Sequence, residues 1–433
     1  GSGTAVTLAC GATQSGFGRE GSVDWQTGSI KTATFTAVNG QGFFANTSGG
    51  AFVMNLPAGT AGNIVAVVDY TNTFQTNALT ITPNGSQKIG GVAASIDLDT
   101  EGQSVTFVYV DDTEGWKNVQ DSTSNITGNP FIVATGGTET TSGNFKIHKF
   151  TGPGTFTVSA ISGCAPLNNV DYLVVAGGGS GGTANNGDAG GGGGAGGARM
   201  SSGTASGCYS ASPLGSGVSA LPVSVQGYSI VVGAGGAGSS LPAPSPTTNP
   251  GNRGSNSTFS TITSTGGGSG QQRSSSNPTG PGGSGGGAGR WNTSTTYTGN
   301  TPPVSPSQGF PGGLSQAPAS RNAGGGGGAS AAGGTGSGCA AGAGGAGISN
   351  SITASPVAYA GGGGGGGIPV PSESVTGVPG AGGTGGGGAG GGNPGSGGTA
   401  GTVNTGGGSG GGSAAIGEGF ATNAGGSGIV IIR

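Results

Sequence analysis

The sequence predicts a mainly β protein with essentially no α-helix, in which an all-β, sandwich-like module precedes a glycine-rich domain. Glycine is the first indication: 25 of the 110 glycines lie in residues 1–170 and 85 in residues 171–433. Glycine thus makes up about one residue in three of the second part, whereas its average usage in proteins is roughly 7%. Charged residues make up only 6% of the chain, unlike the charged composition of disordered segments. Short β-branched and aromatic runs fill the first part, which indicates strands.

Residues 1–20 are small and polar, and we interpret them as a connector. Residues 21–125 form the predicted sandwich module, because short apolar runs alternate with turn-forming pairs such as Asn39-Gly40. Strands at intervals of about 8–12 residues with turns between them are typical of an antiparallel sandwich or barrel. The runs lie at residues 34–38, 42–44, 51–56, 63–70, 79–82, 95–98 and 104–110.

Residues 126–170 form a predicted β-strand lead-in to the glycine-rich domain, which spans residues 171–433. Three apolar runs recur at the beginning, middle and end of this domain, at residues 172–176, 228–236 and 428–433. We expect these three runs to pair as one small sheet that clamps the domain, since pairing would also fix a terminus that otherwise frays.

The glycine runs between these strands predict rods of the polyglycine-II type, joined by polar tip loops. A polyproline-II-like helix has three residues per turn and a rise of about 3.1 Å, so residues 361–367 would span about 22 Å. Without Cβ atoms such rods pack closely, and the backbone groups of one rod bond to its neighbours. Cooperative bonding is needed to offset a backbone entropy of about 1–2 kcal/mol per ordered residue. Single alanines in the runs (Ala195, Ala329, Ala381 and Ala389) are expected on outer faces.

Three passages frame this domain: KIHKFTGPGTFTV at residues 146–158, DYLVVAGGG at 171–179 and GGSGIVIIR at 425–433. Together they resemble the glycine-rich domain of bacteriophage tail-fibre and virion-surface proteins. Residues 21–118, with VDWQ at 23–26 and NLPA at 55–58, look like the β module that precedes it in marine phage fibres. The rods are similar to those of phage adhesins that present variable loops to host receptors.

The resemblance implies a non-enzymatic protein of the virion that binds a host cell-surface receptor. The receptor would be a glycan or an outer-membrane protein. Further implied partners are other tail and fibre proteins of the virion, and the implied assembly is a homotrimer. A polysaccharide-degrading tailspike, and a purely structural or ice-binding rod bundle, are the alternatives.

Recognition is expected in the loops, because glycine rods have almost no side chains with which to discriminate ligands. Large rings near arginine and amide groups suit stacking on a sugar or anchoring an interface. In the alternative interpretation, these rings pin their loop onto the bundle. The candidate receptor-binding residues are Arg290, Trp291, Asn292, Tyr297 and Phe310, together with Glu373 of the segment 368–379.

Composition argues against several other classes of function. The net charge of −3 gives no polycationic surface for nucleic acid, and no apolar run is long enough for membrane insertion. Matches to a nucleotide-binding glycine motif are expected by chance in such a sequence, so no cofactor is predicted.

We predict no catalytic residue and no metal site. The single histidine, His148, lies within a predicted strand and is interpreted as structural. The acidic groups around Asp97 and Asp111 lie at strand ends, where solvated carboxylates are ordinary. A disulfide between Cys208 and Cys339, or two free thiols, are both compatible with the sequence.

Overall fold

The computed structural model divides the chain into two compact units, residues 1–127 and 128–433, each with its own hydrophobic core. The residues that the structure describes are 23–122, 131–162, 167–239, 250–273, 280–316, 322–338, 340–368, 377–392, 396–415 and 418–433.

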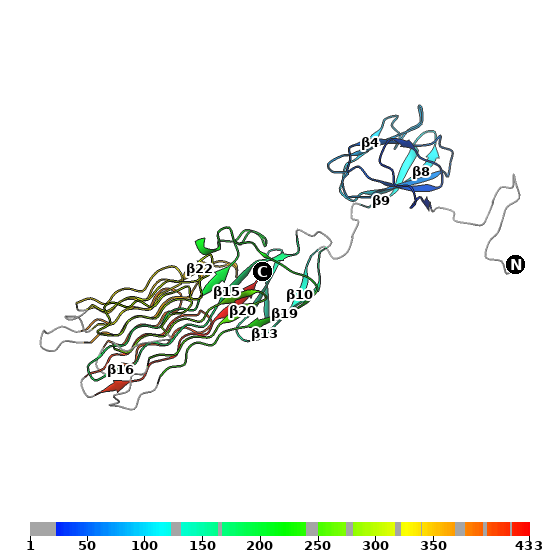
Figure 1. Cartoon of the computed structure of the whole chain (residues 1–433). Coiled ribbons are helices and arrows are strands. Elements are labelled where there is room, and N and C mark those ends of the chain that lie inside the picture. The colour runs from blue at the N-terminus through cyan, green and yellow to red at the C-terminus, as the bar shows by residue number, and fades with distance from the viewer. Residues whose placement is uncertain are drawn as a thin grey trace, which may run out of the picture. The chain divides into compact units, whose positions relative to one another are not determined.

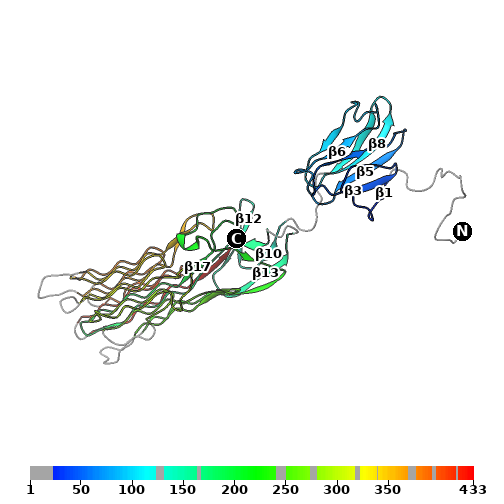
Figure 2. The same ribbon diagram turned by 45° about the horizontal axis from the view of Figure 1, so that its top comes forward.

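The first unit is a sandwich of two sheets (Figure 2). One sheet has the order β1-β3-β5-β8-β9, with β1 (Asp24–Trp25), β3 (Gln41–Ala45), β5 (Ile64–Asp69), β8 (Ser104–Asp111) and β9 (Gly115–Ser122). The other has the order β2-β4-β6-β7, with β2 (Phe35–Thr36), β4 (Phe52–Asn55), β6 (Leu79–Thr82) and β7 (Ile96–Leu98).

The strands of this sandwich are not all antiparallel, and the expectation of an antiparallel module was wrong in this respect. The pairs β1–β3, β3–β5, β2–β4 and β4–β6 are parallel. The chain alternates between the two sheets from β1 to β6, so each strand pairs with the next but one. A turn pair such as Asn39-Gly40 therefore joins strands of different sheets and closes no hairpin.

Alternation of side chains along the strands fills the core of this sandwich. In β3, Phe43 and Ala45 point inward and are buried, and β8 contributes Val105, Phe107 and Tyr109. Met54 and Ile81 of the second sheet and Trp116 of β9 complete the same cluster.

Two further five-stranded sheets form one end of the second unit (Figure 1). The first has the order β10-β13-β19-β20-β21, with β10 (Val133–Thr135), β13 (Gly154–Ala160), β19 (Gln226–Val231), β20 (Ser257–Phe259) and β21 (Ile262–Ser264). The second has the order β11-β12-β25-β15-β17, with β11 (Thr138–Ser142), β12 (Phe145–Phe150), β25 (Ile429–Ile432), β15 (Tyr172–Val175) and β17 (Ala198–Met200).

The predicted clamp is confirmed for the first and last of its three strands. β25 pairs antiparallel with β15, and on its other side with β12. The middle strand, β19, was assigned wrongly, since it pairs with β13 and β20 in the other sheet. One hydrophobic cluster joins the two sheets, with Phe156, Tyr228 and Phe259 from one and Tyr172 and Val430 from the other.

Three two-stranded pairs and a 3₁₀ turn also belong to the second unit. The two-stranded pairs are β14 (Asn169–Val170) with β18 (Leu221–Pro222), β16 (Ala184–Asn185) with β24 (Gly419–Phe420), and β22 (Ile348–Asn350) with β23 (Val357–Tyr359). A 3₁₀ turn, η2, spans Pro213–Gly215.

Glycine-rich segments run side by side away from these sheets, and their hydrogen bonds repeat every three residues, as expected for polyglycine II (Figure 1). In segment 190–197, the amides of Gly190, Gly193 and Gly196 donate to segment 406–412. The next residue of each triplet donates to segment 265–271, and the third donates to segment 324–327.

The carbonyl groups of the same segment have the same period. They accept from segments 363–366, 179–182 with Ala176, and 284–287. Segment 190–197 thus has six hydrogen-bonded neighbours, and segment 361–367 likewise bonds to six others. The interior of this unit is a bundle whose contacts are made by the backbone.

Packing between rods leaves no room for a Cβ atom at many positions. A methyl group on Gly192 would clash with the Gly363 carbonyl, and one on Gly363 with the Ser409 carbonyl. The alanines differ in position. Ala381 is exposed and Ala389 half-buried, but Ala195 and Ala329 are fully buried, against expectation. Both methyl groups belong to the hydrophobic cluster beneath β15 and β25, where a side chain has partners.

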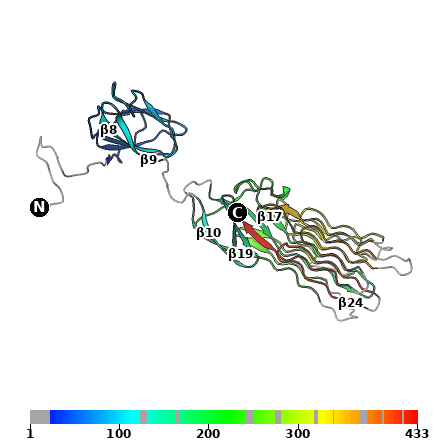
Figure 3. The same cartoon turned by 180° about the vertical axis from the view of Figure 1, so that it is seen from behind.

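The rods give the second unit two distinct ends. We call the end formed by the two five-stranded sheets the sheet end. The opposite end, where β16 pairs with β24, is the far end (Figures 1 and 3).

Candidate functional site

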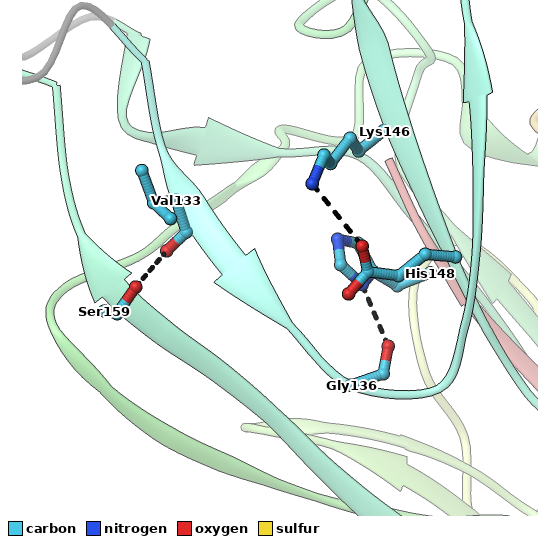
Figure 4. A network of polar contacts seen from close by, with 6 residues as sticks. Val133, Gly136, Lys146, His148 and Ser159 are labelled. Atoms are coloured by element: carbon cyan, nitrogen blue, oxygen red, sulfur yellow. Dashed lines mark hydrogen bonds and ion pairs between the residues drawn. The ribbon is translucent and has the colours of Figure 1, made fainter.

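His148 is buried at the sheet end. It lies on β12 with 4% of its surface exposed, and its ring packs edge-on against Phe156 at a centroid distance of 5.0 Å. Its Nδ1 lies 2.9 Å from the Gly136 carbonyl oxygen, which makes Nδ1–H the donor (Figure 4). Nearby, Lys146 Nζ lies 3.4 Å from Glu139 Oε2. The imidazole therefore ties the turn before β11 to β12.

A group of charged and aromatic side chains gathers at the far end around Asp188, which follows the turn after β16. Asp188 is 5% exposed, and Arg290 Nη1 donates to its Oδ1 at 3.1 Å. The same Nη1 also donates to the Gly187 carbonyl. Arg273 approaches from a third segment, with its Nε 3.5 Å from Asp188 Oδ2. One buried carboxylate thus connects two arginines that come from different rods.

Trp291 lies against the arginine of this ion pair. Its ring centroid lies 4.5 Å from the Arg290 guanidinium carbon, and 39% of its surface is exposed. The backbone φ of Trp291 is +73°, a conformation that side chains rarely adopt. Together with the cation–π contact, this backbone conformation holds a large ring at the surface.

Burial raises the pKa of the Asp188 carboxyl group above its ordinary value. The positive charges of Arg273 and Arg290, and hydrogen bonds from Arg290 and Trp291, act in the opposite direction and lower it. Desolvation is the largest of these effects, as expected for a carboxylate removed from water.

Asn292 organises the turn after Trp291 from a buried position. Its Nδ2 donates to Gln271 Oε1 at 2.7 Å and to the Thr295 carbonyl at 3.1 Å. Its Oδ1 accepts from the Thr295 amide at 3.0 Å. With 8% of its surface exposed, Asn292 supports the position of Trp291 more than it offers a surface group itself.

Tyr297 and Phe310 do not join this group. The Tyr297 side chain is 7% exposed, and a methyl group at Gly280 would clash with its ring, so the ring packs directly on the bundle. Phe310 is half-buried, and its carbonyl accepts from the Gly285 amide within the rods. The segment 290–310, which contains five of the candidate residues, is thus a far-end turn followed by a passage along the bundle.

Glu373 lies outside the described residues, as does Cys339. Cys208 is an exposed free thiol. In the part of the chain that the structure describes, no group of three or more His, Cys, Asp or Glu is placed to hold a metal ion. No described helix is long and apolar enough to cross a membrane.

A pocket of about 440 Å³ lies at the sheet end beside η2 and β22. No carboxylate is among its described lining residues, which are Ser210, Ala211, Ser212, Pro213, Ser330, Gly347, Ile348, Ser349, Ser351 and Pro356. Asp171, which immediately precedes β15, is fully buried and accepts from the Ser201 hydroxyl at 2.6 Å and from the Ser206 amide and hydroxyl at 2.8 Å.

Sequence reasoning placed Arg290, Trp291 and Asn292 together but missed Asp188, Arg273 and Gln271. Asp188 and Arg273 are two of only ten charged residues between positions 171 and 433, which was an available signal. Their contact depends on the path that the chain takes between successive rods, and no local sequence pattern predicts that path.

A family model described as a glycine-rich domain matches residues 150–433. No curated protein sequence matches the chain at a significant level.

Proposed function

Because this chain belongs to the family of glycine-rich domain proteins, we propose that it is a non-enzymatic tail-fibre or virion-surface protein of a bacteriophage. It attaches the virion to a host cell by binding a surface receptor, either a glycan or an outer-membrane protein. Its other partners are tail and fibre proteins of the virion, and it acts as a homotrimer. The resemblance of the framing strands supports the assignment to a phage.

One observation carries the attachment role: the bundle uses its backbone for packing, while Trp291 and two arginines lie together around Asp188 at its far end. A rod such as segment 190–197 is bonded to six neighbours and offers a ligand almost nothing to discriminate. Trp291 and Arg273 are exposed at the far end on a support that these rods make rigid. Binding residues on loops held by a rigid scaffold are a common arrangement for recognition.

The proposed receptor-binding surface consists of Trp291, Arg290 and Arg273. Trp and Arg dominate the energetics of many interfaces, because they combine a large contact area with hydrogen-bond donors. Tyr297 is left out because its ring is buried, and Asn292 acts by positioning the turn.

The test is binding of the fluorescently labelled full chain to a panel of bacterial cells and to lipopolysaccharide isolated from them. We expect Trp291→Ala to weaken binding to the responsive strain by at least about tenfold, the ~1.4 kcal/mol of a modest hot spot. The matched control is Phe131→Ala, which removes a ring that is 68% exposed at the sheet end and should leave binding unchanged.

Three results would contradict the proposal. A folded Trp291→Ala chain that binds like the unaltered protein would move the receptor site elsewhere. Sustained release of reducing ends from host polysaccharide would identify a depolymerase, and thermal hysteresis without cell binding would identify an ice-binding protein.

A further inference from the structure

The first unit carries three aromatic rings on the outer face of its five-stranded sheet. Trp25 of β1 is 40% exposed, Phe44 of β3 is half-buried, and Tyr70, the residue after β5, is 50% exposed. The centroids of Trp25 and Phe44 are 5.3 Å apart, and those of Phe44 and Tyr70 are 6.3 Å apart. The rings therefore form a continuous row across three neighbouring strands.

This row is separate from the core of the sandwich. Side chains alternate along β3, so Phe43 and Ala45 enter the core while Gly42 and Phe44 lie on the outer face. Core packing therefore does not explain the row. Exposed rings grouped in this way indicate an interaction surface.

Gly42 determines how the Trp25 indole lies. It is the register partner of Trp25, and a methyl group at Gly42 would lie 2.6 Å from Trp25 Cε3 and 2.7 Å from Cδ2. The indole can rest against the backbone only because this residue has no side chain. In this position the Trp25 residue keeps 40% of its surface exposed, so part of the indole is accessible for stacking.

Polar groups lie beside the last ring of the row. Asn46 follows β3 next to Tyr70, and its Oδ1 accepts from the Ser48 amide and from the Thr71 hydroxyl, both at 3.0 Å. Since both of these bonds use Oδ1, the amide NH₂ and the Tyr70 hydroxyl are the donors at this end. Rings combined with a few placed polar groups are what a sugar ring requires, because its faces are apolar and its edge is polar.

Charge restricts the ligand further. Residues 23–122 contain nine acidic and three basic side chains, so the unit has a negative field. Phosphate or carboxylate groups of nucleic acids and acidic polysaccharides would be repelled by this field. An uncharged ligand would not be repelled by it.

We propose that Trp25, Phe44 and Tyr70 form a stacking platform for an uncharged glycan chain, a second binding site that does not depend on the far-end receptor site. Successive sugar units lie across the three strands, with the first ring on the Trp25 indole. Asn46 and the Tyr70 hydroxyl donate hydrogen bonds to sugar hydroxyls at the other end.

The experiment titrates the full chain with cellohexaose, mannohexaose and the hexamer of N-acetylglucosamine, using calorimetry and tryptophan fluorescence. At least one neutral probe should bind, with little dependence on salt concentration. Trp25→Ala and Tyr70→Ala should each weaken that binding by at least about tenfold. Trp291→Ala is the matched control and should bind the probe normally, which separates this site from the proposed receptor site. Fluorescence of the buried Trp116 reports whether each variant is folded.

Absence of binding to all three neutral probes at millimolar concentration would overturn the proposal. So would normal binding by the folded Tyr70→Ala variant, whose ring lies outside the core. Sedimentation velocity tests the other occupant of this face, a second copy of the chain. Dissociation of an oligomer by Trp25→Ala would assign the row to contact between copies and would also overturn the proposal.

Discussion

Individual residues of the second unit fall into two opposite kinds. At Gly193, the useful property is the absence of a side chain: its amide donates to Ser409 and its carbonyl accepts from Gly363, both at 2.8 Å. At Trp291 the useful property is the side chain itself, which remains 39% exposed although the unit contains few large side chains. Packing and the proposed recognition thus depend on different residues, which makes each testable by substitution.

The packing role of glycine is tested by Gly193→Ala. A methyl group there would clash with the Gly179 carbonyl. The backbones of Gly193 and Gly179 are both held by hydrogen bonds to other segments. Overpacking of this kind costs about 1–3 kcal/mol or more, so the unfolding midpoint in urea should fall. Gly152→Ala is the control, since nothing lies within 4 Å of its added methyl group, and its effect should stay within about 0.5 kcal/mol. Equal stability of the two variants would contradict close packing of the rods.

Asp188 gives the far end a predictable response to pH. Its pKa is raised above the ordinary value of 3.8, so the folded state keeps the proton after the unfolded state has lost it. The free energy of unfolding that depends on Asp188 must then fall as pH rises from about 3.8 to the raised pKa, and level off above it. Urea unfolding of the wild type and of Asp188→Asn at a series of pH values isolates this effect. A wild type that gains stability relative to Asp188→Asn as the pH rises over this interval would contradict the assignment.

Contacts between residues that are close in the sequence could be predicted, whereas contacts between residues that are far apart in the sequence could not. Arg290, Trp291 and Asn292 are consecutive, so their proximity required no knowledge of the fold. Asp188 and Arg273 come from the ends of two other rods, and their contact with Arg290 depends on the path of the whole bundle. Burial of Tyr297 depends on the neighbouring Gly280, whose lack of a side chain makes room for the ring.

At the scale of elements, local sequence predicted the strands better than their partners. β15, β19 and β25 are all apolar runs, but only β15 and β25 share a sheet. Composition alone cannot decide this pairing, because two sheets that face one core require the same kind of side chain. The short hairpin of β20 and β21 completes the sheet of β19, and with three residues per strand it is too short for a clear alternation signal.

The rods themselves make a prediction for spectroscopy. Their hydrogen bonds run between segments with a period of three, so far-UV circular dichroism should show a polyproline-II-type signature. Because each interior rod is bonded to six neighbours, the signature should disappear cooperatively on heating. A gradual, featureless melt would indicate that the glycine runs are not held in this bundle.

At the scale of the molecule, the two compact units have separate cores and opposite charge. Residues 1–127 carry four basic and ten acidic side chains, and residues 128–433 carry eight basic and five acidic ones. Each unit also has its own exposed aromatic surface, the row on the first sandwich and Trp291 at the far end. Two independent cores imply two unfolding transitions, which can be separated by damaging one unit.

Deletion of residues 429–433 should damage only the second unit. β25 is buried along its whole length and pairs with both β12 and β15. Val430 and Ile432 belong to the cluster between the two sheets, and Ile429 and Ile431 to the cluster against the rods. Its loss would remove one pairing partner from each of β12 and β15, split the sheet between them and open both clusters, and the rods begin and end at these strands. We therefore expect protease sensitivity throughout residues 167–428, while the transition of residues 23–122 remains as an internal control. Retained protease resistance of residues 167–428 would mean that rod-to-rod hydrogen bonds alone hold the bundle together.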